Sequence, residues 1–206
     1  GTGKNRDGAK APERCGHHDA PHEAGASAAR DHGGSSHSWN GGVSVRHISD
    51  DSVRTVAREF GGVEHRLELV REKDGVRYFN SSIDTSPTRT AAALRSFSER
   101  PIVICGGYDK HIPFEPLAEV LIERARAVVL TGATAQKIGD AIMNNPNFDF
   151  KKLPLYFEKE FHEAVKTASK IAHKGDVVIL SPACASFDAF ENFAARGRFF
   201  KSLVME

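Results

Sequence analysis

From residue 43 onward, short apolar runs alternate with segments in which apolar residues recur at helical spacing. Short, continuous apolar runs, typical of buried parallel strands, lie at residues 101–105, 127–130, 153–156 and 176–180. Apolar residues at helical spacing predict helices over about residues 87–99, 115–125, 133–144, 158–173 and 186–203. Strands that alternate with helices in this way predict an α/β fold, with a doubly wound and mostly parallel sheet.

Two further elements precede this alternation. Ser49, Asp50 and Asp51 are residue types suited to a helix N-cap and first turn, and the helical pattern after them stops at Gly61-Gly62. Residues 67–71 and 76–79 have the pattern of two strands, and the turn between them contains Asp74-Gly75. We therefore expect a helix and then a leading β-hairpin at the start or edge of the sheet.

Residues 1–42 differ in composition from the rest of the chain. They contain no Leu, Ile, Val, Met, Phe or Tyr, but hold nine of the 18 glycines and five of the ten histidines. Such a segment cannot bury enough apolar surface to offset the entropy lost on ordering. We predict a disordered, low-complexity lead over 1–42 and one folded domain over 43–206.

Overall charge and apolar content exclude several classes of protein. The formal net charge is +1, so no overall field would recruit nucleic acid or an anionic membrane. The apolar runs are too short to span a bilayer, and no secretory signal pattern opens the chain. Three cysteines are too few for a disulfide framework. These features favour a cytoplasmic protein without nucleic-acid or membrane partners.

Four polar segments each follow a predicted strand directly. They are residues 80–88, 106–110, 131–134 and 181–188. Ligands of open α/β sheets bind beyond the carboxyl ends of the strands, so we expect these segments to converge on one edge. Their hydroxyls, their backbone N–H groups and Lys110 suit a small carboxylate or phosphate. The competing interpretation is that the hydroxyls only cap the following helices.

Other motifs give weaker signals. The spacing GxxxxGK[ST] is absent and GxGxxG is not met, so Gly106-Gly107 is better explained as a tight turn. Cys15, His17, His18 and His22 lack a complete ligand set, so we predict no metal site. Cys184 and Cys105 are expected to be packing residues. Arg66 could reach a phosphate or be a solvated arginine, and the residue pattern alone leaves both open.

Several motifs, in order and spacing, resemble one protein family over about three quarters of the chain. They are Ser49-Asp50-Asp51, residues 60–68, Asn80-Ser81-Ser82 with residues 85–90, residues 106–110, residues 130–134, and residues 181–188 leading to Asn192-Phe193 and Arg196-Gly197. On these residues the chain is identified as similar to the C-terminal domain of the Mur ligases, in particular the branch that adds D-glutamate. A Rossmann-like fold is implied by this resemblance.

The resemblance also implies a reaction and its partners. Members of this branch phosphorylate the carboxyl of UDP-N-acetylmuramoyl-L-alanine with ATP and Mg²⁺, and the amine of D-glutamate then attacks the acyl phosphate. By resemblance, the residues that hold D-glutamate are Thr85, Lys110, Ser186, Phe187 and Phe193. By the same resemblance, the residues on the nucleotide side are Arg66, Asn80 and Ser81. No catalytic residue is assigned.

Two positions depart from the family pattern. Ser81 stands where Asp is usual, and Asp84 stands where a small neutral residue is usual. The phosphate loop, magnesium ligands and UDP-binding domain of the family have no counterpart in this sequence. We therefore expect a chain that binds no ATP or Mg²⁺ alone and is inactive alone. The alternative is a non-catalytic binding module for an acidic amino acid or a nucleotide.

Overall fold

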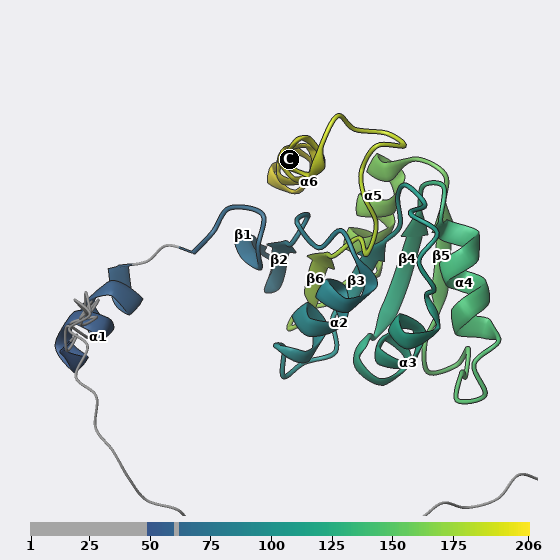
Figure 1. The fold of residues 1–206 in the computed structure, drawn as a ribbon, viewed down its shortest axis with the longest axis horizontal. Coiled ribbons are helices and arrows are strands. Elements are labelled where there is room, and N and C mark those ends of the chain that lie inside the picture. Colours follow the sequence, from purple (N-terminus) through teal and green to yellow (C-terminus); the bar gives the residue numbers. More distant parts are fainter. Residues whose placement is uncertain (1–48, 60–61) are drawn as a thin grey trace, which may run out of the picture. The chain divides into compact units, whose positions relative to one another are not determined.

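A computed structural model describes residues 49–59 and 62–206 (Figure 1). The elements in these residues are α1 (Asp50–Glu59), β1 (Glu68–Lys73), β2 (Val76–Asn80), α2 (Pro87–Arg95), β3 (Ile102–Cys105), α3 (Glu115–Arg124), β4 (Ala127–Thr131), α4 (Ala135–Met143), β5 (Leu155–Glu158), α5 (Phe161–Ile171), β6 (Val177–Leu180) and α6 (Phe193–Met205). The predictions of disorder over residues 1–42 and of a domain boundary at residue 43 lie outside the described residues.

Helix α1 begins as its sequence predicts. The Ser49 hydroxyl accepts a hydrogen bond from the Ser52 backbone N–H at 3.2 Å, which satisfies one donor of the first turn. Asp50 and Asp51 occupy that first turn, where their negative charges interact favourably with the helix dipole.

The sheet has six strands in the order β1-β2-β6-β3-β4-β5. Every neighbouring pair is parallel except β1 and β2, which form the antiparallel hairpin at the sheet edge. The prediction of a mostly parallel α/β sheet with a leading hairpin is therefore confirmed. In the hairpin turn, Asp74 and Gly75 both have positive φ (55° and 77°), the conformation that Asp-Gly turns favour.

Two hydrophobic clusters cover opposite faces of the sheet. Successive side chains of a strand point to opposite faces, so Val103 of β3 joins one cluster while Ile102 joins the other. Helices α2, α3 and α4 contribute to the cluster of Val103, and α5 and α6 contribute to the cluster of Ile102 (Figure 1). No helix in the described part of the chain is long and apolar enough to cross a membrane.

The structure corrects the expected bounds of several elements. Helix α6 begins at Phe193 and not near residue 186, because residues 181–192 form turns and Asn192 caps the helix by accepting from the Ala195 N–H at 2.8 Å. Helix α2 ends at Arg95 and not at 99, because Ser96 donates its hydroxyl to the Ala93 carbonyl. The remaining helices and strands lie within a few residues of their expected bounds.

Candidate functional site

Hydrogen bonds join the four strand-end segments at the carboxyl edge of the sheet. The Ser181 hydroxyl donates to the Asp84 carboxylate at 2.8 Å, and Gly106 N–H donates to the Pro182 carbonyl at 2.8 Å. Thr134 N–H donates to the Gly107 carbonyl at 3.1 Å. The expectation that these segments converge on one edge is therefore confirmed.

Close backbone contacts require glycine at 106 and 107. Both residues have positive φ (120° and 146°), which residues with a side chain rarely adopt. A Cβ on Gly106 would collide with the Thr131 carbonyl, and one on Gly107 would collide with the Ala185 carbonyl. The two glycines thus form the tight turn that the sequence indicates, and they bring the segment with Lys110 against its neighbours.

Lys110 and Thr85 lie together on this edge. The Lys110 Nζ donates to the Thr85 carbonyl at 2.9 Å, and both residues are accessible to solvent. Within residues 49–59 and 62–206, no carboxylate forms an ion pair with Lys110, whereas Lys137 pairs with one carboxylate and Lys201 with two. The ammonium of Lys110 is therefore available to an anionic ligand.

Ser186 and the two phenylalanines flank this pair with different exposure. Ser186 is 2% exposed, and the Ala185 carbonyl before it accepts from the Tyr108 N–H at 3.0 Å. Phe187 is 67% exposed, with its ring edge-on to that of Tyr108 and the centroids 6.1 Å apart. Phe193 is half-buried at the start of α6. The sequence-predicted residues of the amino-acid site thus come from adjoining segments of one edge.

The three residues predicted on the nucleotide side have different surroundings. Arg66 is exposed on a short loop in which its N–H donates to the Val63 carbonyl at 3.0 Å. Asn80 is fully buried, and its side-chain amide contacts His65 Nδ1 at 2.9 Å and Glu68 Oε2 at 3.0 Å. Ser81 is also fully buried, and its hydroxyl accepts from the Leu67 N–H at 3.2 Å. Asn80 and Ser81 therefore support the loop that carries Arg66.

Two arginines line an open hollow of about 400 Å³ beside this loop. Its lining residues are Arg66, Leu67, Ser81, Asp84, Arg89, Ala92 and Ala93. Neither Arg66 nor Arg89 forms an ion pair with any carboxylate of the described residues, although Arg89 donates to the Ile83 carbonyl at 3.4 Å. Asp84 is buried and accepts from the Ser181 hydroxyl at 2.8 Å, so one negative charge also lines the hollow.

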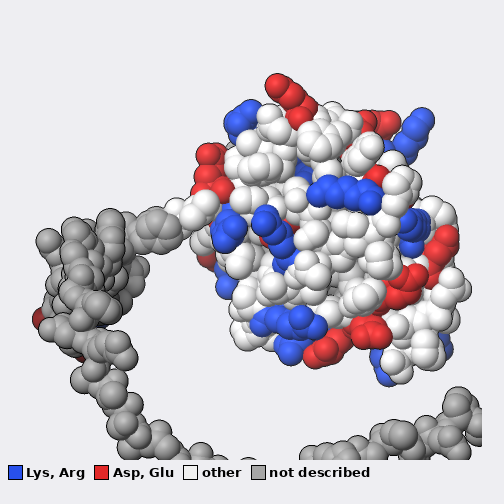
Figure 2. Space-filling model, in the orientation of Figure 1, with Lys and Arg blue, Asp and Glu red and all other residues white. Residues whose placement is uncertain are grey.

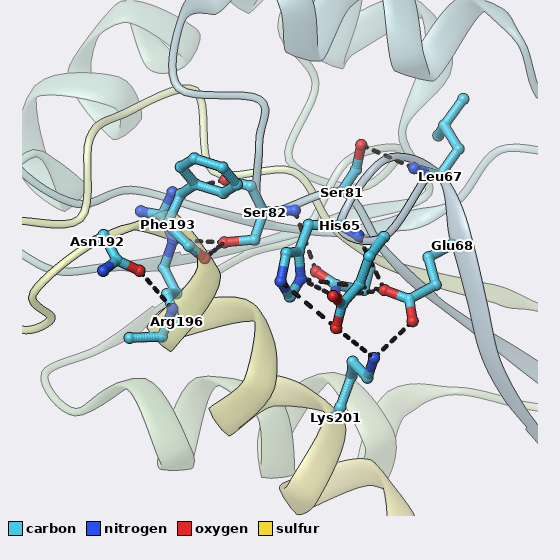
Figure 3. Close-up of polar contacts among 12 residues, drawn as sticks. His65, Leu67, Glu68, Ser81, Ser82, Asn192, Phe193, Arg196 and Lys201 are labelled. Carbon is cyan, nitrogen blue, oxygen red and sulfur yellow. Dashed lines mark hydrogen bonds and ion pairs between the residues drawn. The ribbon is translucent and has the colours of Figure 1, made fainter. Parts of the chain in front are cut away.

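A network of polar side chains ties the Arg66 loop to α6 (Figure 3). Lys201 Nζ donates to Glu64 Oε1 at 3.0 Å and to Glu68 Oε1 at 2.6 Å. The hydrogen bond to Glu68 is the main cause that raises the pKa of Lys201. Burial opposes ionisation of Glu68, but hydrogen bonds from Lys201 and the His65 N–H together lower its pKa.

The same network contains a group of metal-ligand types, Glu64, His65 and Glu68. The ammonium of Lys201 contacts both carboxylates, so the negative charge that a cation would use is already paired. The histidine and cysteine group that the sequence singled out, Cys15, His17, His18 and His22, lies outside the described residues.

The two described cysteines are packing residues, as expected. Burial raises the pKa of the Cys184 thiol to about 11, and its sulfur lies 3.1 Å from the Thr134 hydroxyl. Burial also raises the pKa of Cys105 well above its ordinary value. Neither thiol has the lowered pKa of a nucleophile.

Two buried residues that support the site, His65 and Arg196, stand within the family motifs but received no role from the sequence. His65 packs edge-on to Phe193, with ring centroids 6.0 Å apart, and a Cβ on Gly197 would collide with it. Arg196 is 2% exposed and is bonded to two strand-end segments. A charged residue on the apolar face of a helix was the available signal for Arg196, because buried arginines are rare unless their N–H groups are satisfied.

On the face seen in Figure 2, positive side chains do not form one continuous basic surface. Figure 2 shows Lys and Arg in separate small patches among neutral and acidic residues.

A family model and the sequence relatives point to the same protein family. The model of the family described as "Mur ligase, glutamate ligase domain" matches residues 65–184. The chain is 54% identical over 156 residues to the UDP-N-acetylmuramoylalanine–D-glutamate ligase of Clostridium novyi. It is 48% identical over 157 residues to the protein of the same name from Clostridium perfringens. Each match covers 76% of this chain and 34% of the relative, so the chain spans about a third of these relatives' length.

Solved structures agree on the fold. A bifunctional folylpolyglutamate synthase/dihydrofolate synthase from Yersinia pestis matches with a TM-score of 0.53 at 15% identity, over 76% of this chain and 35% of that one. A UDP-N-acetylmuramoyl-L-alanyl-D-glutamate–2,6-diaminopimelate ligase matches with a TM-score of 0.50 at 14% identity, over 77% of this chain and 36% of that one. The family model and the sequence relatives show that the chain belongs to the Mur ligase family and carries its C-terminal, glutamate ligase domain.

Proposed function

We propose that this chain provides the amino-acid-binding part of an ATP-dependent ligase that joins D-glutamate to UDP-N-acetylmuramoyl-L-alanine. The relatives that are about half identical to it bear the name of that ligase. The whole reaction would also need the parts of those relatives that this chain does not span.

The observation that carries this proposal is the cationic group of Lys110 beside hydroxyl-bearing segments. Lys110 is held by the neutral carbonyl of Thr85 and forms no ion pair among the described residues. One carboxylate of D-glutamate would pair with Lys110, and the hydroxyls of Thr85 and Ser186 would donate to its oxygens. Phe187 and Phe193 would border the aliphatic part of the ligand.

The exposed guanidinium of Arg66 would bind the phosphates of the nucleotide. It lies on the rim of an open hollow with Arg89, and guanidinium groups match phosphate oxygens in geometry and charge. ATP would supply the phosphoryl group that activates the carboxyl of the nucleotide-sugar substrate. The role of this domain is then to hold and orient the attacking amine. Among the described residues, the one cluster of metal-ligand side chains is already paired with Lys201, so we assign Mg²⁺ no ligand here.

Replacing Lys110 by Ala tests the amino-acid site. In the wild-type chain, D-glutamate should shift the amide NMR signals of residues around Lys110, Thr85 and Ser186. Lys110→Ala should abolish these shifts without unfolding the domain, because the side chain is exposed and contributes little to packing. Lys137→Ala is the matched control, since Lys137 is also an exposed lysine but already pairs with Asp109. An unchanged titration in Lys110→Ala would remove Lys110 from the site.

A phosphate-release assay separates the ligase from its rival. The alternative is a non-catalytic module that holds an acidic amino acid or a nucleotide without turnover. We expect no phosphate release from UDP-N-acetylmuramoyl-L-alanine, ATP and D-glutamate with this chain alone. Addition of the N-terminal two thirds of the C. novyi relative should produce release if the chain is a ligase domain. Phosphate release by this chain alone would contradict the expectation that it is inactive without the rest of the ligase.

A further inference from the structure

Arg196 is buried near the start of α6, at the carboxyl edge of the sheet (Figure 3). Its Nε donates to the Ser82 hydroxyl at 3.0 Å, and Nη2 donates to the carbonyls of Ser82 at 3.0 Å and Cys184 at 3.1 Å. Its Nη1 donates to the Ala185 carbonyl at 3.1 Å. One planar group thus joins two segments that lie more than a hundred residues apart in the sequence.

One arm of these contacts leads to Lys110. The Ala185 carbonyl accepts from Arg196 and also from the Tyr108 N–H at 3.0 Å. Tyr108 lies two residues before Lys110 and directly after Gly107, whose missing Cβ leaves room for Arg196 Nη1. The Ala185 carbonyl is thus shared between Arg196 and the segment of Lys110.

The other arm leads to Thr85 and Phe193. Ser82 accepts from Arg196 through its hydroxyl and its carbonyl, and its own hydroxyl donates to the Phe193 carbonyl at 2.7 Å. Ser82 is three residues before Thr85, whose carbonyl accepts from Lys110. The contacts close into a ring around the amino-acid site, and Arg196 is the member that touches both halves.

The charge of Arg196 has no direct ion-pair partner inside this ring. All of its acceptors are uncharged, and no carboxylate of residues 49–59 and 62–206 forms an ion pair with it. Burial lowers its pKa to about 10, which still leaves the guanidinium protonated at neutral pH. The negative charges of Asp188 and Asp84 favour the charged guanidinium without forming an ion pair with it, and an anionic ligand at the same edge would favour it further.

We propose that Arg196 is a positioning residue of the amino-acid site. It fixes the spacing between the segments that carry Thr85 and Ser186, through Ser82 on one and Cys184 and Ala185 on the other, and its positive charge adds to the attraction for an anionic amino acid. The identity of the ligand as D-glutamate rests on the proposed function. The ring of contacts does not depend on it.

Three substitutions separate the spacing role from the charge. Arg196→Lys keeps a positive charge but cannot span acceptors on two segments, because an ammonium donates from one point. Arg196→Met removes both contributions. Ser82→Ala removes the hydroxyl contacts and leaves the charge in place. Leu121→Ala, in a fully buried position on α3, is the control for a general loss of stability.

The measurements are amide NMR titration of the 206-residue chain with D-glutamate and hydrogen exchange of the Tyr108 amide. We expect Arg196→Lys to weaken D-glutamate binding by about tenfold or more, the effect of losing a hydrogen bond to a charged group. Arg196→Met should weaken it further. The Tyr108 amide should exchange faster in both variants. Leu121→Ala should lower stability but leave the affinity unchanged.

Several results would overturn the proposal. They are wild-type affinity in Arg196→Met, an unchanged Tyr108 exchange rate in Arg196→Lys, or an equal loss of affinity in Leu121→Ala. If the wild-type chain does not bind D-glutamate, the proposed function is contradicted, and the exchange rates alone decide on the positioning role. If an Arg196 variant fails to fold, Ser82→Ala decides with the same two measurements.

Discussion

Burial decides the chemistry of the two described cysteines. Cys184 follows a strand at the carboxyl edge, a place where a helix dipole often activates a thiol. In this structure it is 2% exposed, and burial raises its pKa to about 11. The position in the sequence would suit a nucleophile, whereas the surroundings make the residue inert.

We predict that Cys105 and Cys184 resist an aromatic disulfide reagent at pH 8. With a pKa of about 11, roughly one Cys184 in a thousand would be a thiolate at that pH, and the reagent would also have to reach a buried sulfur. The test uses a Cys15→Ser variant, so that only the two described thiols react, and records the release of the coloured thiol product. Labelling should begin only in denaturant. Stoichiometric labelling within minutes under native conditions would contradict the buried positions.

At the scale of elements, α6 connects the sheet edge to the Arg66 loop. Asn192 caps the helix, Arg196 and Phe193 contact the strand-end segments, and Lys201 pairs with the acidic residues of the loop. Gly197 leaves space for the buried His65 against the helix. A change in where α6 begins would therefore move several parts of the site together.

We predict that Asn192→Ala destabilises the domain by about 1 kcal/mol. The variant loses the side-chain oxygen that accepts from the Ala195 N–H, so one donor of the first turn is unsatisfied. Urea unfolding followed by circular dichroism measures this change in the free energy of unfolding. Asn192→Asp keeps an acceptor and should retain most of the stability. Equal destabilisation by Asp and Ala would show that the cap bond is not the cause.

The sequence predicts most elements correctly because their signals are local. The buried strands are continuous apolar runs, and the Asp74-Gly75 turn needs no knowledge of distant residues. The start of α6 was predicted wrongly, because residues 186–192 have helix-compatible apolar spacing but pack through tertiary contacts, such as Phe190 against Phe161. The ring around Arg196 was also missed, since it depends on carbonyl groups that only the folded chain brings together.

For the whole molecule, the network of Glu68 and Lys201 gives stability a pH dependence on both sides of neutrality. The folded state lowers the pKa of Glu68, so its contribution is present above the ordinary value of 4.5 and is lost as the pH falls through the folded pKa. The folded state raises the pKa of Lys201, so its contribution is present below 10.5 and is lost as the pH rises through the folded pKa.

We predict that Lys201→Met reduces this pH dependence. At pH 7 the variant should lose up to about 1 kcal/mol, because both partners are partly exposed to solvent. Glu68 would lose its main charged partner, so the acid loss of stability should also become smaller. Urea unfolding between pH 3 and 10 measures both effects. Lys166→Met is the control, since Lys166 pairs with Glu163 on the surface of α5. Parallel pH profiles for wild type and Lys201→Met would contradict the prediction.

The irregular edge strand β1 has a consequence for self-association. Its pairing with β2 shifts register between Leu69 and Arg71, and its later residues Arg71, Glu72 and Lys73 are charged. A second copy that added itself to this edge would have to match the bulge and bury those charges. The hairpin therefore makes this edge of the sheet a poor template for edge-to-edge pairing. Concentrated solutions of the domain should resist fibril formation through this strand.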